Sequence, residues 1–325
     1  MADSITTEAG AEREHLPPTD KMERKLFAPA KLNLGLRIFP RRTDGFHDIE
    51  SWFVPISLRD TLSFRKADAL TLELSGLAAE LSAAPETNLV GRAALALAKV
   101  AGMPPGAHIH LHKLIPTGGG LGGGSSDAAT TLLALRQLWK LPMSDQDLRR
   151  IAAQLGSDVP FFVHGHSAVC RGRGEIIEAL PLNRLLYAVL VMPPYGTSTK
   201  EVYEMFDRQA VQADTTVINW MEISQMNAAG IRAGIRNDLE GPAFAVTPKL
   251  RGLRDQVGAI IHRPVHLSGS GSTLFILADQ AAEAESMVQL LEQQLEPTVR
   301  VLPVRLQNES GDGFIPGGCE IHVQR

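Results

Sequence analysis

A run of glycines between residues 116 and 135 is the first part of this sequence that could do chemistry. The stretch PTGGGLGGGSSDAATTLLAL holds six glycines among the seven residues 118–124, and helix-forming residues follow at once. Glycines before a helix let backbone N–H groups approach an anion closely, and the helix aims its own unpaired N–H groups and its dipole at the same place. The pattern therefore predicts a phosphate site. A tight turn without a ligand is the alternative, although such a turn needs only one or two glycines.

Two familiar nucleotide-binding loops do not fit this stretch. Gly118, Gly120 and Gly123 have the spacing GxGxxG, but a dinucleotide-binding unit also needs a following βαβ unit, and here another helix follows. A Walker A loop ends in Gly-Lys-Ser/Thr, whereas this loop ends in Gly-Ser-Ser. The backbone amides are then the candidate phosphate ligands. Ser125 and Ser126 offer hydroxyl groups, or either of them caps the helix.

A second turn rich in serine and glycine, SGSGST, occupies residues 268–273 between two apolar stretches. By itself this pattern is typical of a plain hairpin turn. Together with the first loop, it could close over a nucleotide from another part of the chain. Both interpretations stay open on the sequence alone.

Asp158 and Lys31 are the candidate reacting groups of a phosphoryl transfer, in which a carboxylate orients the acceptor hydroxyl and accepts its proton. Asp158 precedes the apolar stretch VPFFV, where an unpaired carboxylate is costly and calls for a cationic partner. Lys31 lies on the polar side of an alternating strand, and Asn33 projects from the same face two residues on. The alternatives are a capping or turn aspartate and a solvated strand lysine.

Lys113 lies on an otherwise apolar strand face, which it shares with Ile109, Leu111 and Ile115. A lysine that only contacts solvent is expected on the polar face of a strand, not on this apolar one. The side chain either extends from the strand end to water or faces the bound phosphates.

Strands and helices must position these residues. Leu32, Leu34, Leu36 and Ile38 alternate with polar or small residues and predict a half-buried first strand. Further strands are predicted over residues 50–64, 69–76, 107–116, 187–194 and 299–306, with two more within 264–279. Helices are predicted over 86–102, 125–139, 144–156 and 280–295, and a loop with a hairpin over 157–180. The absence of regular βαβ alternation favours an α+β fold over a doubly wound parallel sheet.

The overall composition bears on which classes of partner and which cell compartment to expect. With 325 residues, 44% hydrophobic content and a net charge of −4, the sequence gives no reason to expect nucleic-acid or membrane binding. Cys170 and Cys319 form no CxxC pair, which indicates reduced thiols in a cytoplasmic protein. We expect a disordered leader over 1–22 and domains over 23–180 and 181–325, and it stays open whether the last strand returns to the first domain.

Three stretches, APAKLNLGLRI, IPTGGGLGGGSSDAA and LSGSGST, resemble the motifs of the GHMP kinases. RRTDGFHDIES, LGSDVPFFVHGHSAVCRGRGE and RNDLE resemble, more narrowly, the branch that phosphorylates the 2-hydroxyl of a cytidyl diphosphate methylerythritol. The resemblance covers residues 25–305. It implies a two-domain α+β fold, with a ribosomal-protein-S5-like N-terminal domain and a ferredoxin-like C-terminal domain. It also implies ATP and Mg²⁺ as cofactors and a small-molecule partner, in a monomer or weak homodimer.

The resemblance also implies roles for single residues. Asp158 matches the catalytic aspartate and Lys31 the lysine beside it. His47 matches a histidine that binds cytosine and Phe46 a tyrosine that stacks on it, while Tyr203 matches the aromatic residue on the other side of the base. By pattern alone, His47 is an exposed loop residue and Tyr203 a core residue.

The remaining assignments follow from the same motifs. We assign ATP binding to Lys113, Pro116, Gly118, Gly119, Gly120, Leu121, Gly122, Gly123, Gly124, Ser125 and Ser126. We assign substrate binding to Asn33, Phe46, His47, Tyr203, Ser268, Gly269 and Gly271. No metal ligand is assigned. The alternative functions are another GHMP kinase, of the homoserine or mevalonate type, and a non-catalytic nucleotide-binding regulator.

Overall fold

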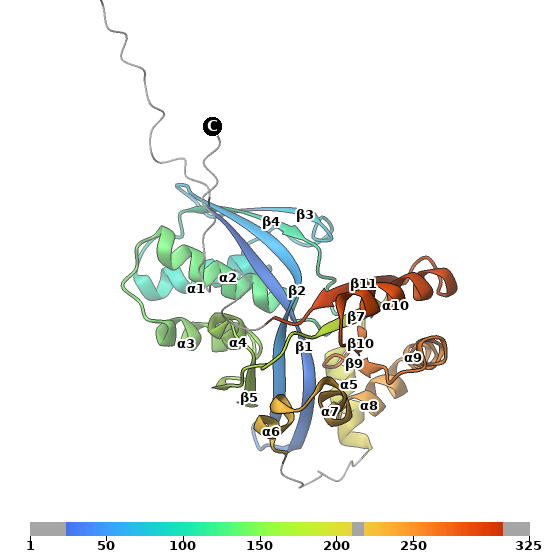
Figure 1. The fold of residues 1–325 in the computed structure, drawn as a ribbon. Coiled ribbons are helices and arrows are strands. Elements are labelled where there is room, and N and C mark those ends of the chain that lie inside the picture. Colours follow the sequence, from blue (N-terminus) through green and yellow to red (C-terminus); the bar gives the residue numbers. More distant parts are fainter. Residues whose placement is uncertain (1–23, 210–217, 308–325) are drawn as a thin grey trace, which may run out of the picture.

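Two long strands, β1 (Arg24–Arg41) and β2 (His47–Lys66), run antiparallel through the centre of the molecule (Figure 1). The computed structural model of the chain describes residues 24–209 and 218–307. The predicted leader over 1–22 and Cys319 lie outside the described residues. None of the described helices is long and apolar enough to cross a lipid bilayer.

The two long strands belong to a seven-stranded sheet of order β3-β4-β2-β1-β8, in which β5 also pairs with β2, and β6 pairs with β5. Among the described strands of this sheet, β3 runs parallel to β4 and β8 parallel to β1, and the other pairs are antiparallel. The prediction of an α+β fold is therefore confirmed. The further strands of this sheet are β3 (Thr71–Gly76), β4 (Ala107–Lys113), β5 (Ala168–Gly172), β6 (Ile176–Ala179) and β8 (Arg236–Asn237).

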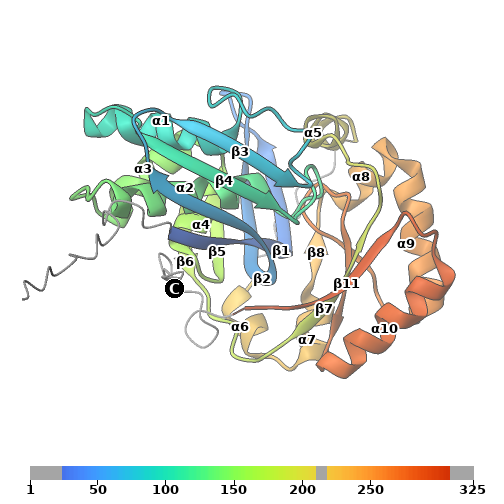
Figure 2. The ribbon, with the colours of Figure 1, turned by 90° about the horizontal axis from the view of Figure 1, so that it is seen from above.

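Four helices pack beside the first sheet, and Figures 1 and 2 show them together on one side of β1 and β2. They are α1 (Leu89–Ala101), α2 (Gly123–Leu138), α3 (Asp145–Leu155) and α4 (Val159–His164). Gly102 ends α1 in a left-handed conformation and Ser144 caps α3, which agrees with the end of the helix predicted over 86–102 and the start of the one predicted over 144–156. The prediction of a loop over 157–164 is wrong, because Pro160 near the start of α4 suits a first helical turn and apolar residues bury the helix.

A second sheet, of order β11-β7-β10-β9, is antiparallel throughout its described strands. Its strands are β7 (Tyr187–Met192), β9 (His266–Leu267), β10 (Leu274–Ala278) and β11 (Arg300–Arg305). The helices of this half are α5 (Thr199–Arg208), α6 (Trp220–Gln225), α7 (Ala228–Gly234), α8 (Glu240–Val246), α9 (Pro248–Ile261) and α10 (Ala281–Gln294). The last strand pairs with β7, while β8 joins the first sheet, so the division near residue 180 stays a prediction.

The prediction that β1 is half-buried is wrong. Residues 28–38 are buried on both faces of the strand, including the polar side chains of Lys31, Asn33 and Arg37. One face packs toward α2, and the chain of the second half covers the other, so Leu34 contacts a core that includes Leu190 of β7. An alternating pattern does not reveal this second covering, because it arises from residues more than 150 positions away.

Candidate active site

A cavity of about 380 Å³ lies where β1, the glycine loop, the start of α4 and helix α5 meet. The predicted site residues that line it are Lys31, Asn33, Pro116, Gly118, Gly119, Gly120, Leu121, Gly122, Gly123, Gly124, Ser125, Asp158, Tyr203 and Gly269. The fold thus collects side chains and backbone from both halves of the chain around one space. Lys31 and Asp158 are the only charged residues among the described ones that line the cavity, so they are the candidates for its chemistry.

Lys31 and Asp158 face each other in this cavity. The ammonium of Lys31 lies 3.9 Å from the Asp158 carboxylate and 2.5 Å from the Asn33 Oδ1 acceptor. The side chain of Lys31 is 4% exposed and that of Asp158 is 31% exposed, so the lysine is embedded and the carboxylate opens to the cavity. The prediction that Lys31 and Asn33 share a face is confirmed, and two register shifts of β1, between Pro29 and Lys31 and between Asn33 and Gly35, flank the pair.

Burial changes the ionisation of this part of the site. The lack of solvent lowers the pKa of Lys31, and the negative charge of Asp158 opposes that shift. Burial raises the pKa of the neighbouring Cys170 thiol, so the thiol stays protonated and packs as a small apolar side chain. The charge of Lys31 is therefore favoured by its carboxylate partner and opposed by burial.

The glycine loop holds a conformation that other residues adopt at a cost. Gly118, Gly120 and Gly122 all have positive φ angles, of 70°, 75° and 70°. Backbone bonds tie the loop to both halves of the chain: the Lys31 amide donates to Leu121 O at 3.0 Å, and the Thr273 amide donates to Gly119 O at 3.1 Å. These bonds fix the loop between the first strand and the Ser/Gly turn.

Helix α2 begins earlier than predicted. Gly122 is its N-cap residue and Gly123 its first residue, so neither Ser125 nor Ser126 caps the helix. The glycines of the loop therefore supply the first turn, where unpaired N–H groups point outward. Ser125 lines the cavity, while the Ser126 hydroxyl is buried and has no hydrogen-bond partner among the described residues.

The Ser/Gly turn over 268–273 joins the antiparallel strands β9 and β10, as a hairpin turn does, and it also packs against the glycine loop. Its closure over a nucleotide stays a prediction. The Ser268 hydroxyl donates to Gly120 O at 3.0 Å and lies 3.5 Å from Asn33 Oδ1. Gly269 lines the cavity, but Ser268 and Gly271 do not. The turn therefore reaches the cavity at Gly269 and Ser270, and its Ser268 supports the glycine loop.

Replacing Gly120 by alanine should destabilise the chain by about 3 kcal/mol, because the new Cβ adds overpacking to a left-handed backbone. That Cβ would lie 2.1 Å from the carbonyl oxygen of Ser268. Gly118→Ala is the matched control, since its φ is also positive but nothing lies within 4 Å of its Cβ. Thermal unfolding of both variants should show the larger loss for Gly120→Ala. Equal losses would mean that the contact with Ser268 does not matter.

Lys113 is not among the residues that line the cavity. Its side chain is 1% exposed, and its ammonium lies 2.6 Å from Asp60 and 2.8 Å from Asp127. These two carboxylates raise the pKa of Lys113 against the opposing effect of burial. The lysine neither extends to water nor opens to the cavity, so its assignment to ATP stays a prediction that the lining residues do not support.

The residues predicted to bind a cytosine base lie at the α5 side of the site. His47 is buried, its Nδ1 lies 2.8 Å from Phe39 O, and its ring centre lies 5.6 Å from that of Tyr203. Phe46 is 49% exposed, and the guanidinium of Arg173 stacks 3.7 Å from its ring centre. Of the three predicted aromatic or imidazole contacts, Tyr203 lines the cavity, while Phe46 and His47 are not among its lining residues.

Several polar residues of the site carry no signal strong enough for sequence analysis to single them out. Asn237 donates to Leu267 O at 2.9 Å and to Gly269 O at 2.7 Å, and so holds the Ser/Gly turn. Asp207 lies 3.1 Å from His47 Nε2. The stretch RNDLE contains Asn237, but one sequence does not show that its amide reaches a turn 30 residues further on.

Comparisons with known proteins identify the family of this chain. The family model "GHMP kinases N terminal domain" matches residues 88–166. A curated 4-diphosphocytidyl-2-C-methyl-D-erythritol kinase of Salinispora tropica is 40% identical over 264 residues, which cover 79% of this chain and 84% of the relative. The kinase of the same name from Heliobacterium modesticaldum is 35% identical and covers 91% of this chain and 99% of its own length.

A solved structure of a kinase named for the same substrate also matches this chain. The crystal structure of a 4-(cytidine 5'-diphospho)-2C-methyl-D-erythritol kinase matches 88% of this chain and 100% of its own, with a TM-score of 0.74 and 35% identity. Sequence similarity at this level over nearly whole chains, together with the same fold, shows common family membership. The chain belongs to the family of 4-diphosphocytidyl-2-C-methyl-D-erythritol kinases, within the GHMP kinases.

Proposed function

We propose that this chain transfers the γ-phosphoryl group of ATP to the 2-hydroxyl of 4-diphosphocytidyl-2-C-methyl-D-erythritol, in the non-mevalonate route to isopentenyl diphosphate. The products are the 2-phosphate and ADP. The relatives carry this substrate in their names, and the fold is that of small-molecule kinases. The proposal assigns the reacting groups of this chain to Lys31 and Asp158.

The observation that carries the proposal is the direction of the Asp158 side chain. Asp158 is the N-cap residue of α4, yet its carboxylate makes no capping hydrogen bond. A capping aspartate normally accepts from the first turn of its helix. This one instead faces Lys31 in the cavity beneath the glycine loop. An aspartate that gives up its cap at a helix start serves another group, and here that group is the acceptor hydroxyl.

In the proposed reaction, Asp158 orients the 2-hydroxyl and takes its proton as the new O–P bond forms. The bond between the γ-phosphorus and the bridging oxygen breaks, and ADP leaves. Lys31 pairs with the Asp158 carboxylate and offers positive charge to the oxygens of the group in transfer. Asn33 accepts from Lys31 and holds its ammonium toward the carboxylate.

The amides of the glycine loop and of the first turn of α2 are proposed to bind the ATP phosphates. Mg²⁺ is part of this proposal, and when bound it would neutralise charge on those phosphates. Within the described residues, no group of three or more His, Cys, Asp or Glu side chains is arranged to hold a metal ion. The buried and unpartnered hydroxyl of Ser126, in the first turn of α2, fits the role of a single protein oxygen ligand beside phosphate and water ligands.

The cytosine base is proposed to bind beside Tyr203, His47 and Phe46. Phe46 offers a stacking surface without a hydroxyl group, and the stacked Arg173 covers one face of its ring. The opposite face is then the one available to a base. Asp207 on α5 holds the imidazole of His47 from the other side.

A coupled assay of ADP release, with three acceptors in parallel, tests the proposed function. We expect turnover with 4-diphosphocytidyl-2-C-methyl-D-erythritol and none above background with homoserine or mevalonate, because those acceptors have no base for the Phe46–His47 region. Turnover only with homoserine or mevalonate would identify another kinase of the superfamily. Nucleotide binding without turnover of any acceptor would identify a regulator.

A further inference from the structure

A buried network of three charges lies beneath the glycine loop. The ammonium of Lys113 lies 2.6 Å from Asp60 Oδ2 and 2.8 Å from Asp127 Oδ2. The three side chains are 1%, 0% and 3% exposed, in the order Lys113, Asp60, Asp127. Charges without solvent are costly, and an apolar set of similar volume is often the more stable choice. Such a network therefore points to a requirement other than stability.

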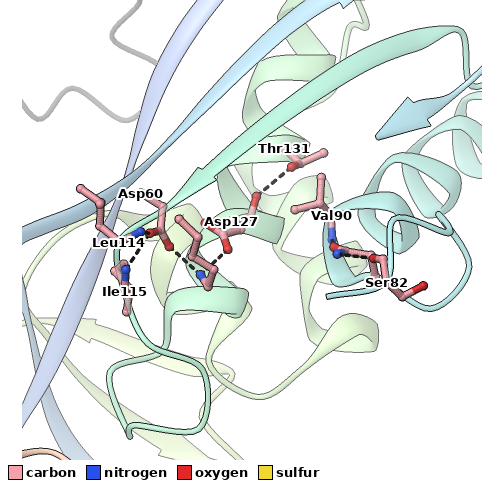
Figure 3. A network of polar contacts seen from close by, with 9 residues as sticks. Asp60, Ser82, Val90, Leu114, Ile115, Asp127 and Thr131 are labelled. Atoms are coloured by element: carbon pink, nitrogen blue, oxygen red, sulfur yellow. Dashed lines mark hydrogen bonds and ion pairs between the residues drawn. The ribbon is translucent and has the colours of Figure 1, made fainter. Parts of the chain in front are cut away.

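The network ties together the two ends of the glycine loop. Asp60 Oδ1 accepts from the amides of Leu114 and Ile115, at 2.5 and 2.8 Å, where the chain leaves β4 (Figure 3). Asp127 lies in the first turns of α2, where the chain leaves the loop. Lys113 bonds to both carboxylates, so the entrance and the exit of the loop are joined through one ammonium group.

The contact between the lysine and the loop is direct. A Cβ at Gly123, the first residue of α2, would lie 2.8 Å from Ile115 Cγ2 and 3.0 Å from Lys113 Nζ, so glycine at this position leaves room for both side chains. On the opposite side, the loop is held by the Ser/Gly turn and by β1, as described above. The three charged side chains thus hold the loop on the side that faces the hydrophobic core between the first sheet and helices α1 to α4.

We infer that Asp60, Lys113 and Asp127 form an ion-pair clamp that holds the two ends of the glycine loop at a set spacing, and that Asp60 and Asp127 are positioning residues for nucleotide binding. The inference rests on the proposed function, since it takes ATP phosphates as the ligand of the loop. A loop held in its binding conformation loses less entropy when the ligand binds, so the clamp acts on nucleotide affinity. It does not touch the acceptor, whose affinity is set at the other side of the cavity.

Two variants test the clamp, each of which leaves one ion pair in place. Asp127→Ala cuts the tie to α2 and keeps Lys113 with Asp60. Asp60→Asn keeps an acceptor oxygen for Leu114 and Ile115 and removes the charge. We expect each to raise the KM and Kd for ATP about tenfold, the effect of one lost charge-assisted hydrogen bond. The KM for the acceptor should stay within about twofold, and amide hydrogen exchange in residues 117–122 should become faster.

Leu62→Ala is the matched control. Leu62 is fully buried on β2, two residues from Asp60, and packs in the hydrophobic core between the first sheet and helices α1 to α4. It should lower the Tm at least as much as Asp60→Asn does, with an unchanged KM for ATP. If Leu62→Ala raises the KM for ATP as much as the clamp variants, the network is only a stability element and the inference is wrong.

If the variants do not fold, amide hydrogen exchange in the unaltered protein can still test whether the ends of the loop are held. In the nucleotide-free protein, the amides of Leu114 and Ile115 should exchange slowly, as buried donors to Asp60. Exchange as fast as that of residues 117–119 would overturn the clamp. Failure of the unaltered protein to bind ATP would instead contradict the proposed function, and the exchange result would still decide whether the loop ends are held.

Discussion

Asp158→Ala should lower kcat by a factor of roughly 10² to 10⁴, the usual loss when a positioned proton acceptor is removed. The KM for ATP should stay within about twofold, because the amides of the glycine loop, and not this carboxylate, are proposed to bind the phosphates. The side chain opens to the cavity and makes no capping bond, so its removal should leave the fold intact. Steady-state kinetics with both substrates, beside a thermal melt, measure each of these quantities.

Two further variants make the result specific to the carboxylate of Asp158. Asp158→Asn keeps the size and removes the charge, and it should lose nearly as much kcat as the alanine variant. Asp145→Ala removes an exposed aspartate at the start of α3, where it pairs with Arg136, and should leave kcat unchanged. Near-full turnover of Asp158→Ala would show that another group accepts the proton.

Lys31→Met should lower kcat by roughly 10²-fold, as the loss of one preorganised donor to the transition state does in other enzymes. The same variant should keep or raise the Tm, because burial makes the charged lysine costly in the folded state and methionine matches its length without a charge. Loss of activity without loss of stability is the mark of a residue kept for function. Kinetics and thermal melts of the two proteins check both halves of this prediction.

The pH dependence of stability should also change in Lys31→Met. Because the folded state lowers the pKa of Lys31 below its ordinary value of 10.5, the unfolded chain binds more protons between the two values. Stability from this group therefore rises with pH across that interval, and the methionine variant should lack the rise. Lys99→Met, at the exposed end of α1, is the control and should leave activity and this slope unchanged. A large fall in Tm for Lys31→Met would show that the lysine serves mainly the fold.

Local patterns determined most of the secondary structure. The ends of α1 and α3 follow from Gly102 and Ser144, since a left-handed glycine and a capping serine act through the adjacent backbone alone. The composition of the glycine run likewise predicts a loop before α2. The short helix α4 was missed because its six residues give too little periodicity to separate a helix from an apolar loop.

Part of the candidate site was likewise predictable from sequence motifs, and part of it was not. Sequence motifs, read through their resemblance to the GHMP kinases, pointed to Lys31, Asp158 and the loop, and the fold brings these together in one cavity. Lys113 was predicted on the face of its strand, but its two carboxylate partners come from β2 and α2, at separations of 53 and 14 residues. A strand pattern reports which face a residue occupies and says nothing of which charges meet it there.

What the sequence alone determined about this protein is its family, its α+β class and the loop that is proposed to receive phosphate, because each depends on residues close together in the chain. Tertiary structure decided the rest: the burial of β1 on both faces, the direction of the Asp158 carboxylate and the partners of Lys113. These features depend on which distant segments exclude water from a side chain. Burial sets the energy of a charge, so the site's electrostatics appear only when the chain has folded.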